Sequence, residues 1–406
     1  MGIIKILVLP FLIVCSTADA NNSVAAASKG VEHRLIQVLK DDVNGVDGLD
    51  NPRAVAVTPD NSRVFVVSGD DNAFAVFNLD KHFNLSFSQI FKNANPAVSG
   101  LEGASAVALL NKGNKAIVSS FYDGSLSIFS HKQDRYHLHK TISDGLTVQR
   151  VFGDKKAVGD LDTLGLLGAW QLVSTTDNKQ LFITGYKSNA VSVFDITPDE
   201  KVVFRRFITT GMASAGGLGN PTGLALSPSN EELFVLGFDE HKLTIFNRDK
   251  NGNLSAKQLL QHGMNGVDQF LNPQKIVVSP DGKFLYIACS GSHSLVVFRK
   301  AENDRYVFLQ AITNKEVDGG LKGAGSLVIS SDGALIYAAG EADTGLVLFQ
   351  KQIDGKLKLI SRLPNKGKPI DNLNGISSIN LSPDGRHLLL TATESDALFV
   401  FEVVNR

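Results

Sequence analysis

The sequence predicts an all-β fold, a seven-bladed β-propeller of four-stranded blades, and three observations lead to it. A phenylalanine closes a short apolar strand seven times at a nearly constant interval. Each copy of this unit reads as several short strands joined by tight turns. The last copy lacks its outermost strand, and a matching strand precedes the first copy, as expected for a closed ring of blades.

The repeat is defined by the positions of its phenylalanines, which are Phe77, Phe129, Phe194, Phe246, Phe298, Phe349 and Phe401. The intervals between them are 52, 65, 52, 52, 51 and 52 residues, so the series is regular apart from one 13-residue insertion. Self-similarity at a fixed period of this length is typical of propellers and other repeat proteins. The chain therefore contains seven copies of one unit.

The fifth copy shows the three inner strands best, over 274–279, 284–288 and 294–299. The first two are joined by Ser279-Pro280-Asp281-Gly282, in which proline presets one backbone dihedral and glycine supplies a positive φ. Similar turns recur in other copies at 58–60, 227–229 and 382–385. These segments are predicted to be hairpin connections.

A fourth strand follows in six copies, over 87–91, 136–142, 202–209, 254–261, 306–313 and 357–363. The seventh copy stops at Arg406 without one, whereas the segment from His33 to Lys40 has the fourth-strand pattern and precedes the first copy. We therefore expect the N-terminal strand to complete the last blade. Such a closure leaves only short, protected sheet edges.

The N-terminus has the pattern of a secretory signal: Lys5, an apolar run from Ile6 to Val14, and then Ala18-Asp19-Ala20. A membrane anchor is the alternative, but the run is shorter than the roughly 20 residues that span a bilayer. Acylation at Cys15 is disfavoured because Val14 is larger than the small residue such sites need. We expect a signal peptide over 1–20, a leader over 21–32, the propeller over 33–406, and a secreted or periplasmic monomer without a transmembrane segment.

Composition excludes several function classes. Lys plus Arg number 40 against 41 Asp plus Glu, so no basic excess favours a nucleic-acid partner. With the signal removed only Cys289 remains, which excludes an intrachain disulfide and a multi-cysteine metal site. The sequence has no P-loop, dinucleotide-binding glycine motif, serine-hydrolase elbow or H-E-x-x-H motif.

The segments 44–50, 279–282, 284–288 and 295–298 resemble the blades of the bacterial seven-bladed β-propeller lactonase family, with its YVTN-type repeats. The resemblance covers nearly all of the mature chain. Because the family includes 6-phosphogluconolactonases and carboxymuconate-lactonising enzymes, it implies lactone hydrolysis or the reverse ring closure. The shared motifs specify strands and turns, so no catalytic residue is carried over from the family.

Candidate catalytic residues come from the turn between the second and third strands of each blade. The position five before each repeat phenylalanine is Asn72, Gly124, Asn189, His241, His293, Thr344 or Asp396. His241 and His293 lie on adjacent blades, Glu240 precedes the first of them, and His262 and Asp268 lie in the linker between the two blades. A neutral imidazole near a carboxylate can act as a general base, and the same groups can bind a divalent metal. We expect no cofactor, and the alternative is a divalent metal at these residues. A second explanation of the pattern is that exposed turns favour polar side chains, without any catalytic role.

Candidate substrate-binding residues begin the innermost strands. Arg53 is the only arginine among the equivalent positions, which otherwise hold Ser105, Trp170, Thr222, Gln274, Gly325 and Ser377. An arginine suits a substrate anion, while Trp170 and Lys275 would add a stacking surface and a charge. The alternatives are a solvated arginine and a tryptophan that only packs. The insertion, within Gly145–Leu167, is expected to act as a lid or a partner contact.

Two functions are compatible with these residues. One is a lactonase or lactone-forming cycloisomerase acting on a small anionic ring, with a histidine as base and Arg53 as anion anchor. The other is a non-catalytic exported propeller that binds a protein, glycan or other ligand through the face carrying these turns and linkers, because propellers have many unrelated functions.

Overall fold

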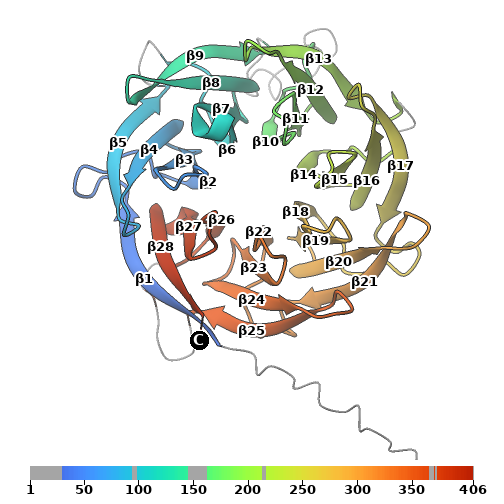
Figure 1. Ribbon diagram of the computed structural model, residues 1–406. Coiled ribbons are helices and arrows are strands. Elements are labelled where there is room, and N and C mark those ends of the chain that lie inside the picture. The colour runs from blue at the N-terminus through green and yellow to red at the C-terminus, as the bar shows by residue number, and fades with distance from the viewer. Residues whose placement is uncertain are drawn as a thin grey trace, which may run out of the picture.

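The computed structural model describes residues 30–93, 98–144, 162–212, 216–364, 370 and 373–405. Seven four-stranded antiparallel sheets are arranged as blades around a central channel (Figure 1). The predicted seven-bladed, all-β propeller is therefore confirmed. The signal sequence and most of the insertion, residues 145–161, lie outside the described residues.

Each blade runs from an innermost to an outermost strand. Blade 1 contains β2 (Pro52–Val57), β3 (Arg63–Ser68), β4 (Ala73–Leu79) and β5 (Leu85–Lys92); blade 2 contains β6 (Ala104–Leu110), β7 (Lys115–Ser120), β8 (Ser125–Lys132) and β9 (Arg135–Ser143). Blade 3 contains β10 (Ala169–Ser174), β11 (Gln180–Gly185), β12 (Ala190–Ile196) and β13 (Val202–Thr209); blade 4 contains β14 (Pro221–Leu226), β15 (Glu232–Gly237), β16 (Lys242–Arg248) and β17 (Leu254–Gln261).

The second half follows the same order. Blade 5 contains β18 (Pro273–Val278), β19 (Phe284–Cys289), β20 (Ser294–Lys300) and β21 (Tyr306–Thr313); blade 6 contains β22 (Ala324–Ile329), β23 (Leu335–Gly340), β24 (Leu346–Lys351) and β25 (Leu357–Leu363). Blade 7 contains β26 (Ile376–Leu381), β27 (His387–Ala392), β28 (Ala397–Asn405) and the N-terminal β1 (Val31–Lys40). Within the residues that the structure describes, short 3-10 helices lie at 111–113 and 393–395. Four of the six predicted outer strands, β13, β17, β21 and β25, have the predicted bounds.

The ring is closed by β1, as predicted, although this strand begins two residues earlier than expected. It pairs antiparallel with β28, from Val31 opposite Asn405 to Lys40 opposite Ala397. The Gln37 amide then exchanges two hydrogen bonds with the backbone of Leu85 in blade 1, at 3.0 and 2.7 Å. Gln258 makes the same exchange with Tyr306 between blades 4 and 5. The N-terminal strand thus makes the contacts of an ordinary outermost strand.

The repeat phenylalanines owe their regular spacing to the core. All seven are at most 1% exposed, and they lie in apolar clusters that join side chains of adjacent blades. Burying one such side chain contributes roughly 1.5–3 kcal/mol, so each copy of the unit needs it. Within the described part of the chain, no helix is long and apolar enough to cross a membrane.

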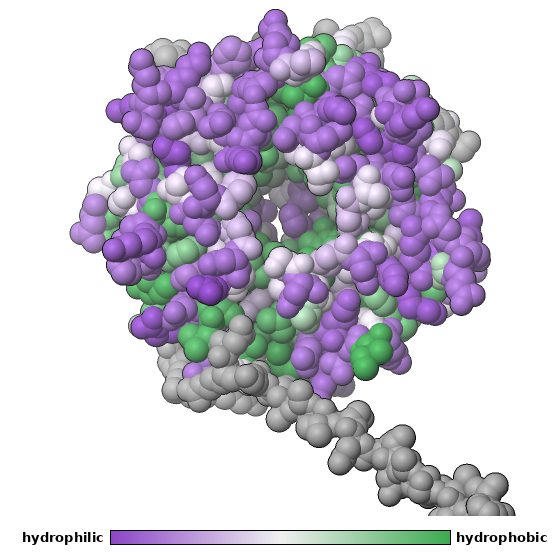
Figure 2. Space-filling model, viewed as in Figure 1, coloured by the Kyte–Doolittle hydropathy of each residue, from purple (hydrophilic) through white to green (hydrophobic). Residues whose placement is uncertain are grey.

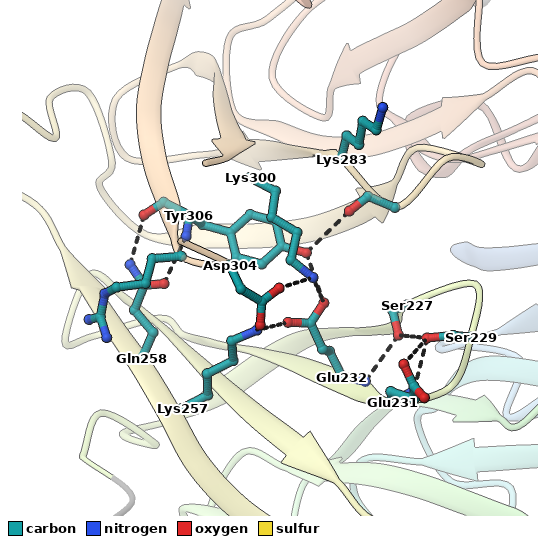
Figure 3. Close-up of polar contacts among 12 residues, drawn as sticks. Ser227, Ser229, Glu231, Glu232, Lys257, Gln258, Lys283, Lys300, Asp304 and Tyr306 are labelled. Atoms are coloured by element: carbon teal, nitrogen blue, oxygen red, sulfur yellow. Dashed lines mark hydrogen bonds and ion pairs between the residues drawn. The ribbon is translucent and has the colours of Figure 1, made fainter. Parts of the chain in front are cut away.

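A buried group of charges joins blades 4 and 5 at the end of the blades where β15 begins (Figure 3). Glu232 is 5% exposed and pairs with Lys257 at 2.5 Å and with Lys300 at 2.9 Å. Asp304 also pairs with both lysines, and the Tyr306 hydroxyl donates to Glu232 Oε2 at 3.0 Å. This Glu232 cluster satisfies its charges internally.

The position of His33 in the closing strand β1 leads us to expect that the free energy of unfolding depends on pH. His33 Nε2 lies 3.1 Å from the Tyr337 hydroxyl of blade 6, and burial lowers the pKa of His33 to about 4. Because the unfolded chain binds this proton near pH 6.5, the stabilisation by neutral His33 is complete above that pH and is lost as the pH falls toward 4. Between pH 7 and pH 4, the His33→Gln variant should therefore lose about 1–2 kcal/mol less unfolding free energy than the parent protein.

Urea unfolding at the two pH values measures this difference. The matched control is His82→Gln, which removes a histidine whose side chain is exposed. An equal acid-induced loss in His33→Gln and the parent protein would show that His33 does not titrate as described.

Candidate functional site

Two rings of side chains surround the channel where the innermost strands begin. The first ring consists of residues 53, 105, 170, 222, 274, 325 and 377, which are second in their strands. The second ring consists of the residues that directly follow the second strands: Gly69, Phe121, Tyr186, Phe238, Ser290, Glu341 and Thr393. We call this region the channel mouth. The channel itself appears as a hollow at the centre of the space-filling view (Figure 2).

Small members of the first ring connect neighbouring blades. The Ser105 hydroxyl donates to the carbonyl of Ala169 in blade 3 at 2.8 Å, and the Thr222 hydroxyl donates to that of Pro273 in blade 5 at 2.8 Å. Ser377 donates in the same way to Pro52 of blade 1. These side chains are therefore engaged in holding the ring together.

Arg53 and Trp170 instead meet each other. The Arg53 guanidinium carbon lies 5.5 Å from the centroid of the Trp170 ring, and Nη2 lies 3.3 Å from Oε1 of Glu341. These residues belong to blades 1, 3 and 6. The two residues predicted from the first ring are thus brought together, and Arg53 is an ion-paired, stacked side chain that is 21% exposed.

Aromatic side chains of the second ring extend this cluster over three consecutive blades. The Trp170 and Phe121 rings are 5.6 Å apart edge-on, Phe121 and Tyr186 are 6.0 Å apart, and Tyr186 and Phe238 are 6.2 Å apart. Ring pairs at these separations attract one another beyond their apolar burial. The result is an aromatic wall with Arg53 and Glu341 beside it.

Sequence reasoning missed the second ring, including Glu341. A signal was present, because each of its members lies eight residues before a repeat phenylalanine. Three successive blades place an aromatic residue there and one places a carboxylate. Comparing every repeat position, rather than only the turns and the strand starts, would have found them.

The predicted catalytic histidines make hydrogen bonds that join blades. The N–H of Asn272 donates to His241 Nδ1 at 3.0 Å, and the N–H of Gly323 donates to His293 Nδ1 at 3.0 Å. Nδ1 of His241 also lies 3.1 Å from a carbonyl oxygen. Because the backbone N–H of Asn272 can only donate, Nδ1 is the acceptor, and the proton of the neutral ring is on Nε2. Equivalent side chains make the same bond: Asn72 to Gly103, Asn189 to Asn220 and Asp396 to Asn51.

The remaining predicted residues also have local partners. The N–H of Phe270 donates to His262 Nδ1 at 3.4 Å, Glu240 pairs with Lys242 at 3.3 Å, and Asp268 accepts the N–H of Gln269 at 2.7 Å. Within the described residues, the one group of three or more potential metal ligands is Asp41, Asp42 and Asp47. The structure does not gather the histidines, Asp268 and Glu240 into such a group, and general-base catalysis by a histidine remains a prediction.

Replacing His241 by asparagine separates a structural role from a catalytic one. His241 has a φ of 54°, and Asn72 and Asn189 adopt the same left-handed backbone and make the same bond. His241→Asn should therefore change the free energy of unfolding by less than about 0.5 kcal/mol. His241→Ala should cost about 1–2 kcal/mol, because it loses the hydrogen bond and tolerates a positive φ poorly. Chemical denaturation measures both, and a stable His241→Asn protein without activity would identify His241 as the base.

Lys275, the third predicted substrate-binding residue, follows Gln274 on the innermost strand β18. Burial lowers the pKa of its ammonium group. Because β18 is the innermost strand of blade 5, Lys275 belongs to the wall of the channel.

Comparison with known proteins agrees with this architecture. The family model described as lactonase, 7-bladed beta-propeller, matches residues 139–406. The chain belongs to this family. A 6-phosphogluconolactonase of Serratia proteamaculans is 24% identical over 281 residues, which cover 66% of this chain and 78% of that protein.

Solved structures of lactonase-like propellers share the fold. A putative 6-phosphogluconolactonase from Bacteroides uniformis has a TM-score of 0.62 at 17% identity, covering 86% of this chain and 94% of that one. The periplasmic gluconolactonase of Pseudomonas aeruginosa has a TM-score of 0.60 at 15% identity, covering 82% of this chain and 95% of that one. This lactonase-family chain thus has the propeller fold over most of its length.

Proposed function

We propose that this member of the lactonase family is exported and hydrolyses a small sugar lactone at the channel mouth. The observation that carries the proposal is the meeting of Arg53, Trp170 and Glu341 from three separate blades. The names of the relatives support a lactone substrate, and one of them is a periplasmic gluconolactonase. The N-terminal signal pattern supports export, and mass spectrometry of the exported protein should find a chain that begins at Asn21.

In the proposed reaction, the Glu341 carboxylate removes a proton from water as the water oxygen attacks the lactone carbonyl carbon. The Arg53 guanidinium donates hydrogen bonds to the resulting oxyanion, which makes the transition state more favourable. The ring C–O bond then breaks, and the leaving oxygen takes the proton back from Glu341. The product is the open-chain hydroxy acid.

The aromatic wall would orient the substrate. Trp170, Phe121, Tyr186 and Phe238 present ring faces and edges, against which the C–H face of a sugar ring packs. Their apolar surface also removes water from one side of the substrate. Arg53 and Glu341 then supply the few polar groups that a small-molecule site needs.

The test is proton release from D-glucono-1,5-lactone by the purified protein in a pH-stat, above the spontaneous rate. Glu341→Gln keeps the size of the side chain but removes the base, and kcat should fall by about 100-fold or more. His241→Asn is the matched comparison and should keep its activity. A chelator arm tests the metal alternative, since loss of turnover on chelation would assign the chemistry to a metal instead.

The non-catalytic binding function remains the second candidate, and the aromatic wall favours it for sugars. Tyr122, next to Phe121 at 5.3 Å, is 45% exposed. A protein that binds gluconate or oligosaccharides in calorimetry, but turns over no lactone, would have this function. Binding would then depend on Trp170 and not on the carboxylate of Glu341.

A further inference from the structure

The wall of the central channel carries no acidic residue. It is formed by the innermost strands β2, β6, β10, β14, β18, β22 and β26 (Figure 1). All seven strands are among the described residues, and their sequences contain two charged residues, Arg53 and Lys275, and no aspartate or glutamate. The ionisable groups of this wall are therefore both basic.

The fold does not require a lysine at position 275. Lys275 lies opposite Ala288 of the second strand, directly after the irregularity at the start of β18. The corresponding positions of the other blades hold Ala54, Ala106, Gln171, Gly223, Ser326 and Ser378. A small or neutral side chain therefore suffices for packing, and the charge needs another explanation.

Lys275 also lacks a counter-charge. Arg53 is paired with Glu341, whereas Lys275 makes no hydrogen bond or ion pair with another described residue. Its pKa is lowered by burial, although part of its surface remains open to solvent. An ammonium group without a counter-charge, in a wall that carries no carboxylate, attracts anions that enter the channel.

Lys275 lies next to the innermost strand of the following blade. Ser378 holds the position of Lys275 in blade 7, and its hydroxyl lies 3.4 Å from the N–H of Val55 in blade 1. A side chain at this position therefore faces the innermost strand of the next blade. For Lys275 that strand is β22, which begins with Ala324, Gly325 and Ser326. A Cβ atom at Gly325 would lie 2.9 Å from Gln274 Oε1, so the absence of a side chain at Gly325 makes room for the amide of Gln274, the residue before Lys275.

We propose that Lys275 binds a small oxyanion, a phosphate or a carboxylate, inside the central channel. Lys275 belongs to blade 5, whereas Arg53 and Glu341, which form the ion pair at the channel mouth, belong to blades 1 and 6. The proposed site does not depend on the proposed lactone hydrolysis, because it requires only the uncompensated ammonium group and the small residues of β22.

The experiment is calorimetric titration of the full mature protein with inorganic phosphate, and separately with acetate, at constant ionic strength. Lys275→Gln introduces the residue that blade 3 has at this position, Gln171, so the variant should fold. Its affinity for the anion should fall by about tenfold or more, while Lys275→Arg should retain binding. Lys283→Gln is the control, since Lys283 is an exposed lysine of the same blade.

The outcomes separate this site from the channel mouth. The proposal is supported if the protein has one saturable site that is weakened in Lys275→Gln and retained in Lys283→Gln and Arg53→Gln. The affinities for phosphate and acetate show which anion is preferred. The proposal is overturned if the parent protein binds neither anion. It is equally overturned if Arg53→Gln abolishes binding and Lys275→Gln does not, because the anion then lies at the mouth.

Discussion

Arg53→Gln is expected to lower kcat/KM for D-glucono-1,5-lactone by about 100–1000-fold, mostly through kcat. Arg53 is the donor that stabilises the oxyanion in the proposed reaction, and glutamine offers no positive charge there. Its loss also leaves Glu341 without its 3.3 Å partner and removes the cation from the Trp170 ring. Steady-state kinetics in a pH-stat measure the effect.

Two further variants make this result specific. Arg53→Lys keeps the charge but loses the planar fork of the guanidinium, so an intermediate activity is expected. Arg63→Gln is the matched control: Arg63 is also in blade 1 and also lies over an aromatic ring, that of Tyr136 at 5.9 Å. Its activity should remain that of the parent protein. An Arg53→Gln enzyme within about threefold of the parent would exclude Arg53 from oxyanion stabilisation.

Glu232→Gln is expected to lower the free energy of unfolding by about 3–5 kcal/mol. Glu232 is 7% exposed in its side chain and is the shared partner of Lys257 and Lys300 (Figure 3). Without its charge, Asp304, whose side chain is 64% exposed, is left as the partner of both ammonium groups. Urea unfolding of the variant and the parent protein measures the loss.

Glu200→Gln provides the comparison for Glu232. Glu200 also pairs with a lysine, Lys115 at 2.9 Å, but its side chain is 43% exposed, so its loss should cost less than about 1 kcal/mol. Equal losses in the two variants would show that burial does not govern these pairs. Lactone turnover by folded Glu232→Gln should equal that of the parent, because Glu232 begins β15 whereas the channel mouth is where β15 ends.

The architecture was predictable from the sequence because every blade packs against its neighbours in the same way. Every copy needs one buried phenylalanine between blades, so the interval of the repeat reports the number of blades directly. The closure was predictable because the last copy lacks an outer strand and the segment from His33 to Lys40 supplies one. Without β1, the edge of β28 would be exposed. These patterns are local, and their sevenfold repetition makes them recognisable in the sequence.

The candidate site was only partly predictable, for a physical reason. Arg53 and Trp170 stood out because their equivalents in other blades differ in size and charge, but which side chains meet depends on the closed ring. Glu341 reaches Arg53 from blade 6, and no spacing along the chain encodes that contact.

The histidines illustrate the reverse case. From sequence alone, His241 and His293 suggested chemistry, and the tertiary structure shows that their Nδ1 atoms accept backbone N–H groups of the following blades. The number of blades, their strands and the closure of the ring can thus be predicted from the sequence, because they follow from short-range patterns and repeated burial. Which polar side chains join blades, and which face each other across the channel, depends on the folded ring, because each such contact has its partner in another blade.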